Sequence, residues 1–250
     1  MDKLVSVIMP VYNSSRFLES AIDSVLNQTH KNLELLIIDD KSTDNSLAIA
    51  EEYAKTDNRI RVIASQVNQG VAKARNQGIA DAAGDYIALL DSDDVWCHDK
   101  LERQLRLLEE KNAVISYCSY DFIDENDNSI MKPFIVEGET TFKKMLYRSV
   151  LSCSTVVIEA ELMKANQFDN VYYHEDYALW MKLMQLNVKA VGVCGVMAHY
   201  RRVSGSRSDN KFKSAKERWR IYRSCLKMGV LESSVAFVGY AISSVVKYFG

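Results

Sequence analysis

The sequence predicts an α/β fold in which helices cover both faces of a mostly parallel sheet. Over residues 1–94, apolar runs of strand length alternate with segments of helical periodicity. The apolar runs are continuous and do not alternate with polar residues, which is typical of strands buried on both faces. A chain of 250 residues can also bury a sizeable core. Alternation of this kind favours strands joined by helical crossovers.

The first half of the chain supplies the regular part of this fold. The first expected helix begins at Ser14, which we assign as its cap, and its apolar stripe includes Leu18, Ile22 and Val25. Right-handed crossovers place the carboxyl ends of the strands on one edge of the sheet. We expect strands at residues 5–9, 33–38, 60–64 and 85–90, and further helices at 43–54 and 71–83.

The second half is less regular. We expect strands at residues 113–120, 154–158 and 188–193, and a helix at 175–186. The acidic turn at residues 124–128 resembles a calcium loop, but it lacks the glycine and the bidentate glutamate that such a loop needs. We divide the chain into a catalytic domain at residues 1–210 and a helical tail at 211–250.

Composition excludes several classes of protein. The formal net charge of −2 gives no reason to expect nucleic-acid binding. The five cysteines are scattered, with no CxxC pair, so neither a disulfide framework nor a zinc site is indicated. The N-terminal apolar run is short and contains Pro10, unlike a signal peptide. A cytoplasmic location is therefore expected.

Polar clusters follow three of the predicted strands, at residues 10–13, 39–42 and 91–94. Ligands of open parallel sheets bind outside the carboxyl ends of the strands. Several carboxylates gathered there repel one another unless a cation or a hydrogen-bond donor offsets their charge. Asp91 and Asp93 have the spacing to share a metal and a nucleotide, and Mn²⁺ or Mg²⁺ accepts one or two carboxylates together with substrate phosphates.

With these motifs, the chain resembles the inverting family 2 glycosyltransferases of the GT-A fold. The resemblance rests on four segments in the order and at the intervals typical of the family, and a later acidic motif extends it to about residue 205. The segments are residues 6–13, 37–44, 68–76 and 84–94, and the acidic motif, His-Glu-Asp-Tyr-Ala-Leu-Trp, begins at residue 174.

The resemblance implies a donor site for a nucleotide sugar. Pro10 and Tyr12 would contact the base, with Tyr12 stacked on it. Asp40 would accept a hydrogen bond from the ring N–H of the base, supported by Asp39. A small base with a ring N–H suits an aspartate acceptor, so a UDP-sugar is favoured, although relatives that use other nucleotides keep similar residues.

The remaining implied roles concern the phosphates, the metal and the acceptor. Lys73 or Arg75 would lie near the nucleotide. Asp91, with Ser92, would bind the nucleoside side of the donor, and Asp93 the metal.

Displacement at the sugar needs a carboxylate within reach of the acceptor hydroxyl. The resemblance implies that Asp176 is the catalytic base, and Glu175 is the alternative. Both residues open a predicted helix, where the helix dipole favours a carboxylate.

Three departures from the usual family pattern bear on the site. Lys41 stands where glycine often follows the two aspartates, and Val203 stands where many relatives carry histidine. His199 is therefore a candidate third metal ligand, with a packed or surface histidine as the alternative. Arg218-Trp219 lacks the glutamine that precedes this pair in processive polysaccharide synthases, which favours transfer of a single sugar.

The basic and amphipathic tail suggests a membrane surface. Residues 201–227 hold ten Lys and Arg against two acidic residues, and apolar residues then recur at helical spacing from Leu231 onward. We expect a peripheral helix on the inner face of the cell membrane; packing against the domain or a second copy, and a membrane span, are alternatives. The resemblance implies an acceptor linked to undecaprenyl diphosphate, as in the synthesis of O-antigen lipopolysaccharide, capsule or wall polysaccharides.

Three other functions fit the sequence less well. A sugar nucleotidyltransferase would carry a glycine-rich basic loop after the first strand, and residues 10–16 contain no glycine. A non-catalytic relative that only binds nucleotide sugar would lack Asp93 or the Glu175-Asp176 pair, and all three are present. A nicotinamide-binding domain is excluded because no G-x-G-x-x-G follows the first strand.

Overall fold

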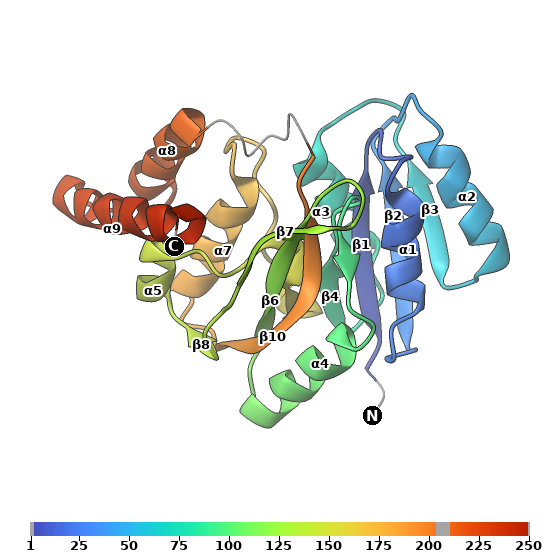
Figure 1. Cartoon of the computed structure of the whole chain (residues 1–250), viewed down its shortest axis with the longest axis horizontal. Helices are drawn as coiled ribbons and strands as arrows, with labels where there is room; N and C mark the ends of the chain where they lie inside the picture. Colours follow the sequence, from blue (N-terminus) through green and yellow to red (C-terminus); the bar gives the residue numbers. More distant parts are fainter. Residues whose placement is uncertain (1–2, 204–210, 250) are drawn as a thin grey trace.

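The computed structural model describes residues 3–203 and 211–249, and it has one central sheet with helices on both faces (Figure 1). The N-terminal half alternates strands and helices as the hydrophobic pattern predicts. Its elements are β1 (Val5–Val11), α1 (Leu18–Leu26), β2 (Leu33–Asp39), α2 (Ser46–Thr56), β3 (Ile60–Ala64), α3 (Val71–Asp81) and β4 (Tyr86–Leu89).

The C-terminal half adds mixed strands and a group of helices. Its strands are β5 (Val95–Trp96), β6 (Ile115–Ile123), β7 (Ser129–Phe134), β8 (Glu139–Thr140), β9 (Val157–Glu159) and β10 (Ala190–Arg201). Its helices are α4 (Lys100–Lys111), α5 (Phe142–Tyr147), α6 (Ala160–Lys164), α7 (Glu175–Gln185), α8 (Lys211–Arg220) and α9 (Val230–Phe249), with a 3₁₀ turn at Cys153–Thr155 and a π turn at Ile221–Cys225.

The strand order is β3-β2-β1-β4-β9-β6-β10-β5. The first four of these strands are parallel, as are β6 and β10, whereas β9 runs antiparallel to both of its neighbours. The predicted mostly parallel α/β sheet is therefore confirmed. Val11 pairs with Asp39 at the ends of β1 and β2, so the polar segments that follow these strands lie side by side.

Close packing of α3 on the sheet depends on Gly78. A Cβ atom at this position would lie 2.5 Å from Cγ2 of Ile8 and 2.7 Å from Cδ1 of Ile38. Any larger residue would push the helix away from β1 and β2. Because α3 also carries Arg75, this contact sets how deeply Arg75 reaches into the site described below.

Four local predictions differ from the structure. Ser14 does not cap α1 with its side chain; its carbonyl accepts the Phe17 and Leu18 amides, and the helix begins at Leu18. The strand predicted at residues 154–158 starts as a 3₁₀ turn and is extended only as β9. The strand predicted at 188–193 continues as β10 to Arg201. Helix α4 was not predicted, although buried Leu101 and Leu108 mark its inner face.

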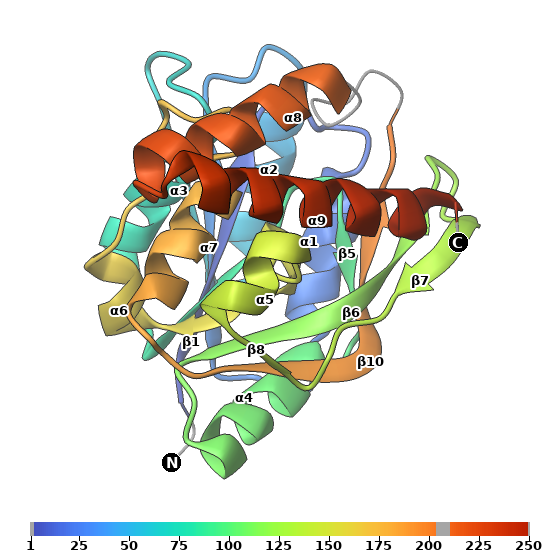
Figure 2. The same ribbon diagram turned by 90° about the vertical axis from the view of Figure 1, so that its left-hand side faces the viewer.

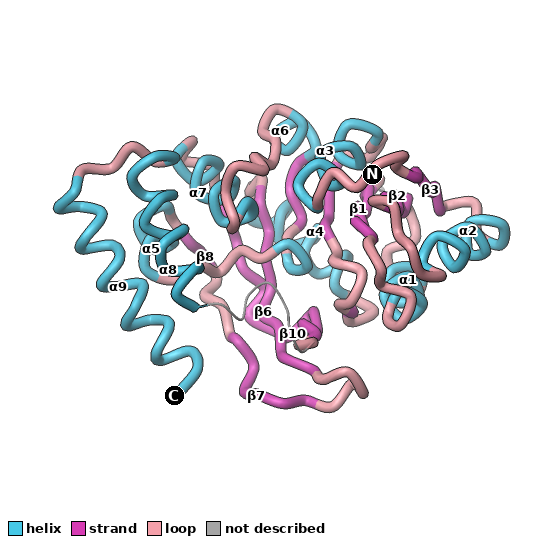
Figure 3. The backbone as a smooth tube through the Cα atoms, turned by 90° about the horizontal axis from the view of Figure 1, so that it is seen from above, coloured by secondary structure: helices cyan, strands magenta, loops and turns pink. Residues whose placement is uncertain are grey.

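The tail packs against the rest of the protein through one face of α9, which lies at the opposite end of the molecule from β3 and α2 (Figure 3). Ser233 and Ala236 are buried, and the Phe237 ring lies edge-on to Trp219 of α8 at 5.9 Å. Gly239 lies against the Tyr147 ring of α5, and Figure 2 shows α9 running across α5. The predicted boundary at residue 210 lies outside the described residues and stays a prediction. Within the described residues, no helix combines the length and the apolar character needed to cross a membrane.

Candidate active site

A cavity of about 770 Å³ opens at the carboxyl ends of β1 and β4. Nine of the twelve residues singled out from the sequence line it. They are Pro10, Tyr12, Asp40, Arg75, Asp91, Ser92, Asp93, Glu175 and Asp176. This is the edge of a parallel sheet at which ligands are expected to bind.

One wall of the cavity offers an aromatic surface and a fixed carboxylate. The Tyr12 side chain is 51% exposed, which is unusual for a tyrosine next to a buried strand, and its ring is free for stacking by a flat ligand. Asp40 is buried, and its two carboxylate oxygens accept the backbone amides of Gln69 and Gly70 at 2.8 and 2.7 Å. A carboxylate keeps further acceptor sites after two such bonds, so Asp40 can still accept from a ligand.

Asp39 supports this wall from outside the cavity. It is buried, and its Oδ2 accepts the Ser42 amide at 3.0 Å across the turn that follows β2. Lys41 in this turn has a φ of 66°, a left-handed conformation that glycine adopts more readily than any other residue. The lysine that departs from the usual family pattern therefore stands at a position where the backbone favours glycine.

The acidic loop, residues 91–94, is held from both sides. Asp94 is buried and accepts a hydrogen bond from the Ser154 hydroxyl, as well as the Arg201 amide at 2.8 Å. The Ser92 hydroxyl donates to Ser14 Oγ at 2.7 Å and joins the loop to the segment after β1. These contacts leave Asp93 on the cavity wall.

Negative charge is concentrated in the acidic loop. Burial, together with the charge of Asp91, raises the pKa of Asp93 to about 6. Burial and the charges of Asp93 and Asp91 raise the pKa of Asp94 well above its ordinary value. A divalent cation would offset this repulsion, so the loop fits a metal on electrostatic grounds.

Arg75 joins the acidic loop to helix α7. It is buried, and its guanidinium donates to Asp91 at 2.7 Å and to Glu175 at 3.1 Å. Since Glu175 is also buried, the ion pair fixes the first turn of α7 against the strand end that carries Asp93. The two halves of the cavity are thereby held at a fixed separation.

Replacing Arg75 with alanine is expected to lower the free energy of unfolding by about 3 kcal/mol, because it removes the buried guanidinium that pairs with buried Glu175 and with Asp91. Urea unfolding followed by circular dichroism measures the change. The exposed Arg106, which lies near Glu110 at 3.8 Å, is the control, and its replacement with alanine should leave the midpoint almost unchanged. Equal effects of the two substitutions would contradict the structural role of Arg75.

Asp176 faces the cavity beside Glu175 and, unlike Glu175, makes no ion pair that fixes it to Arg75. Its Oδ1 accepts the amide of Tyr177 at 2.7 Å, and the side chain is half-buried at the first turn of α7. The helix dipole favours a carboxylate at this end. Glu175 is therefore held by the ion pair with Arg75, whereas Asp176 lines the cavity without that contact.

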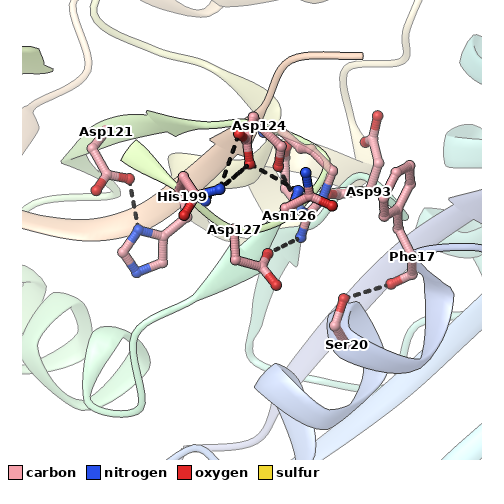
Figure 4. Close-up of polar contacts among 11 residues, drawn as sticks. Phe17, Ser20, Asp93, Asp121, Asp124, Asn126, Asp127 and His199 are labelled. Atoms are coloured by element: carbon pink, nitrogen blue, oxygen red, sulfur yellow. Dashed lines mark hydrogen bonds and ion pairs between the residues drawn. The ribbon is translucent and has the colours of Figure 1, made fainter. Parts of the chain in front are cut away.

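His199 lies on the other side of β10 from the cavity, which argues against its selection as the third metal ligand. Successive side chains of a strand point to opposite faces, and it is Tyr200 that lines the cavity. His199 instead donates from Nδ1 to Asp121 at 2.6 Å, and in Figure 4 its ring is directed toward Asp121 while Asp93 lies at the other side of the view. The described residues contain no group of three or more His, Cys, Asp or Glu arranged to hold a metal ion.

Lys73, the alternative to Arg75 near the nucleotide, also lies outside the main cavity and lines a separate pocket.

Several residues that the sequence did not single out complete the site. Phe17, Tyr173, His174 and Tyr200 line the cavity. The Arg201 guanidinium lies over the Phe17 ring at 4.6 Å and donates to the carbonyl of Asp93 at 2.8 Å.

Arg201 also pairs with Asp127 in the turn at residues 124–128, shown in Figure 4. Arg201 reaches Asp93 and Asp127 because β10 extends to residue 201. No hydrophobic periodicity in the sequence marks this extension of the strand.

Comparison with known proteins identifies the enzyme family of this chain. The sequence model described as "Glycosyl transferase family 2" matches residues 6–163. This chain belongs to glycosyltransferase family 2, and the predicted fold and enzyme class are confirmed.

Among its relatives is an Escherichia coli protein named UDP-Glc:alpha-D-GlcNAc-diphosphoundecaprenol beta-1,3-glucosyltransferase WfgD. The two are 38% identical over 220 residues, which cover 87% of this chain and 85% of the relative.

Solved structures share the fold at low identity. Staphylococcus aureus TarS (residues 1–349) in complex with UDP-GlcNAc has a TM-score of 0.74 and 18% identity, covering 98% of this chain and 73% of that one. The mannosyltransferase PcManGT from Pyrobaculum calidifontis, in complex with GDP-Man and Mn²⁺, has a TM-score of 0.70 and 16% identity, covering 98% and 76%. These likenesses support the GT-A architecture.

Proposed function

We propose that this glycosyltransferase moves a single sugar from a UDP-sugar to a lipid-linked glycan, with inversion at the sugar carbon. One observation carries the proposal: the acidic loop and Asp176 line the same cavity, and Arg75 pairs both with Asp91 of the loop and with Glu175, the neighbour of Asp176. A donor held at the acidic loop would have its sugar directed toward Asp176. This arrangement suits direct displacement by an acceptor hydroxyl.

The nucleotide occupies the wall formed by Tyr12 and Asp40. Tyr12 stacks on the base, and Asp40 accepts the ring N–H while its backbone bonds hold it in place. Uracil presents such an N–H, and the relative WfgD is named for a UDP-Glc donor, which supports UDP over other nucleotides.

Asp93 and Asp91 would hold Mn²⁺ or Mg²⁺ at the diphosphate. Such ions are bound by one or two carboxylates together with substrate phosphates and waters, so Asp93 needs no third protein ligand. The bound ion supplies charge stabilisation for the departing diphosphate. The crowded acidic loop and the Mn²⁺ in the PcManGT complex support a divalent ion.

Asp176 acts as the general base. Its Oδ2 takes the proton of the acceptor hydroxyl, while Oδ1 stays on the Tyr177 amide and fixes the orientation of the carboxylate. The hydroxyl oxygen bonds to the sugar carbon as the bond to the diphosphate breaks, which inverts that carbon. Tyr173, His174 and Tyr200 line the same cavity and would contact the acceptor.

The activity is tested by incubating the purified protein with a UDP-sugar, Mn²⁺ and a synthetic acceptor that carries GlcNAc on a lipid diphosphate. We expect release of UDP together with a glycosylated lipid. UDP-Glc and UDP-GlcNAc are the first donors, and GDP-Man is the control donor. Binding of UDP without transfer to any acceptor would instead favour a non-catalytic nucleotide-sugar-binding relative.

Helix α9 would place the enzyme on an anionic membrane face, where a lipid-linked acceptor resides. Its outer face carries four apolar residues that are 55–80% exposed and recur every three or four positions, about one helical turn. They are Leu231, Val235, Val238 and Ile242. Exposed Lys216 and Lys227 lie before this helix and suit anionic headgroups. The opposite face of α9 is packed on the domain, so membrane contact and packing coexist.

The variant L231Q/V235Q/V238Q/I242Q is expected to bind phosphatidylglycerol vesicles at least about 10-fold more weakly, because it removes the apolar contact area. Vesicle flotation measures the bound fraction. The control V67Q/L186Q removes apolar residues of similar exposure elsewhere on the surface and should bind like the wild type. Unchanged flotation together with a change from dimer to monomer would assign the stripe to a second copy instead.

A further inference from the structure

A second cluster of reactive side chains lies away from the cavity wall. Cys97 follows β5, His199 lies on β10 and Asp121 on β6. The Asp121 carboxylate accepts from His199 Nδ1 at 2.6 Å, and His199 Nε2 lies 3.4 Å from Cys97 Sγ. We call these residues the Cys97 cluster. None of the three lines the cavity of the proposed donor site.

The order of the contacts is that of an activated nucleophile. A carboxylate on Nδ1 fixes the tautomer and orientation of the imidazole, and Nε2 then faces the thiol. A thiol, a base and a carboxylate that orients the base form the arrangement by which cysteine becomes nucleophilic in unrelated enzymes. The Cys97 contact and the Asp121 carboxylate raise the pKa of His199 to about 9, against the effect of burial.

The surroundings add positive charge near the sulfur. Lys100 is buried with its amine 3.9 Å from the centre of the Trp96 ring. Burial lowers the pKa of Lys100 to about 8, and the Cys118 and Cys97 thiols act in the opposite direction. The buried amine of Lys100 therefore lies close to the Cys97 cluster.

Reagents can reach the cluster. Cys97 is half-buried, and the side chains of His199 and Asp121 are 31% and 18% exposed. Of the other cysteines, Cys225 is also half-buried, but burial raises the pKa of its thiol. Cys118 and Cys153 are buried, and burial raises the pKa of both thiols, that of Cys118 to about 12. Cys194 is exposed, with Sγ 4.0 Å from the carbonyl of Gly192.

We propose that the Cys97 cluster is a modification site at which hydroperoxides oxidise Cys97, and that this oxidation loosens the acidic loop. Cys97 Sγ attacks one peroxide oxygen, so an S–O bond forms as the O–O bond breaks. The sulfur is oxidised to a sulfenic acid and the peroxide is reduced. The thiol proton, held by His199, leaves with the departing oxygen as water or an alcohol.

Backbone contacts connect Cys97 to the acidic loop. The Cys97 amide donates to the carbonyl of Met197 at 3.0 Å, and Trp96 pairs with Ala198, so Cys97 lies where β5 meets β10. Two residues beyond His199, Arg201 holds both Asp93 and Asp94. An oxygen added to the sulfur needs room between β5 and β10. Because the contacts of Arg201 with Asp93 and Asp94 lie directly beyond this junction, separation of the two strands would weaken these contacts.

Alkylation by iodoacetamide at pH 7, followed peptide by peptide with mass spectrometry, tests the nucleophile. The imidazole of His199 can take the proton of the Cys97 thiol, whereas the Cys194 sulfur lies beside a backbone carbonyl. Cys97 should therefore react about 10-fold faster than the more exposed Cys194. The variants H199Q and D121N should each slow the alkylation of Cys97 and leave the alkylation rate of Cys194 unchanged. Equal rates for both cysteines, or no effect of either variant, would overturn the proposal.

Hydrogen–deuterium exchange tests the coupling to the acidic loop. After treatment with hydrogen peroxide, dimedone should label Cys97, and peptides that cover residues 91–97 and 197–201 should take up deuterium faster. The variant C97S should exchange like the untreated wild type before and after peroxide. Labelling without faster exchange would refute the coupling, and absence of labelling would refute the modification site. Neither readout depends on sugar transfer.

Discussion

Replacing Asp93 with asparagine is expected to lower kcat/KM for sugar transfer by at least about 10³-fold. The asparagine keeps the size of the side chain but removes the negative charge that a divalent ion needs at the diphosphate. Thermal shift measures the binding step separately. UDP with Mn²⁺ should stabilise the wild type in proportion to its occupancy, and this stabilisation should disappear in the variant.

The control for this substitution is Asp81→Asn, at the exposed end of α3. It removes the same charge from the same fold, and it should leave both transfer and the Mn²⁺-dependent shift intact. If Asp93→Asn retained the wild-type shift and rate, the acidic loop would not be the metal site and the donor assignment would fail with it.

Asp176→Asn is expected to reduce kcat by about 10³-fold while UDP binding stays close to that of the wild type. The base acts on the acceptor, so its loss affects the chemical step and leaves the nucleotide wall unchanged. Steady-state kinetics with a lipid-linked acceptor measure the first effect, and thermal shift with UDP and Mn²⁺ measures the second.

Glu175→Gln is the matched comparison, because it alters the neighbouring carboxylate and keeps its length. It weakens the ion pair with Arg75, so we expect lower stability and less than about a 10-fold change in kcat. The reverse outcome, with Glu175→Gln inactive and Asp176→Asn active, would assign the base to Glu175.

The fold class and the position of the donor wall could be predicted from local pattern. Continuous apolar runs imply strands buried on both faces, and short crossovers imply that these strands are parallel. A polar cluster directly after such a strand must then lie at the ligand-binding edge. The clusters that hold Tyr12, Asp40 and Asp93 were found in this way and their roles from the family resemblance, and all three residues line one cavity.

The second half of the chain was harder to predict, because its strands are mixed in direction and their ends carry no periodic signal. The pairing register of β10 decides which of its residues face the cavity. A shift of this register by one residue would turn every side chain of the strand to the opposite face of the sheet. His199 was a candidate ligand because Val203 stands where many relatives carry histidine, whereas it is Tyr200 that lines the cavity. The amphipathic pattern of the tail was evident in the sequence, but which stripe of α9 is buried depends on Trp219 and Tyr147.

The sequence by itself determined the α/β sheet, the edge at which a ligand binds and the carboxylates gathered there. It did so because burial and periodicity are local properties of a chain. Only the tertiary structure showed that Glu175 pairs with Arg75, and only it revealed the Cys97 cluster. Arg75 meets Glu175 across 100 positions of the sequence, and Cys97 meets His199 across 102. No local pattern encodes such contacts, because they arise where separate strands and helices are packed together.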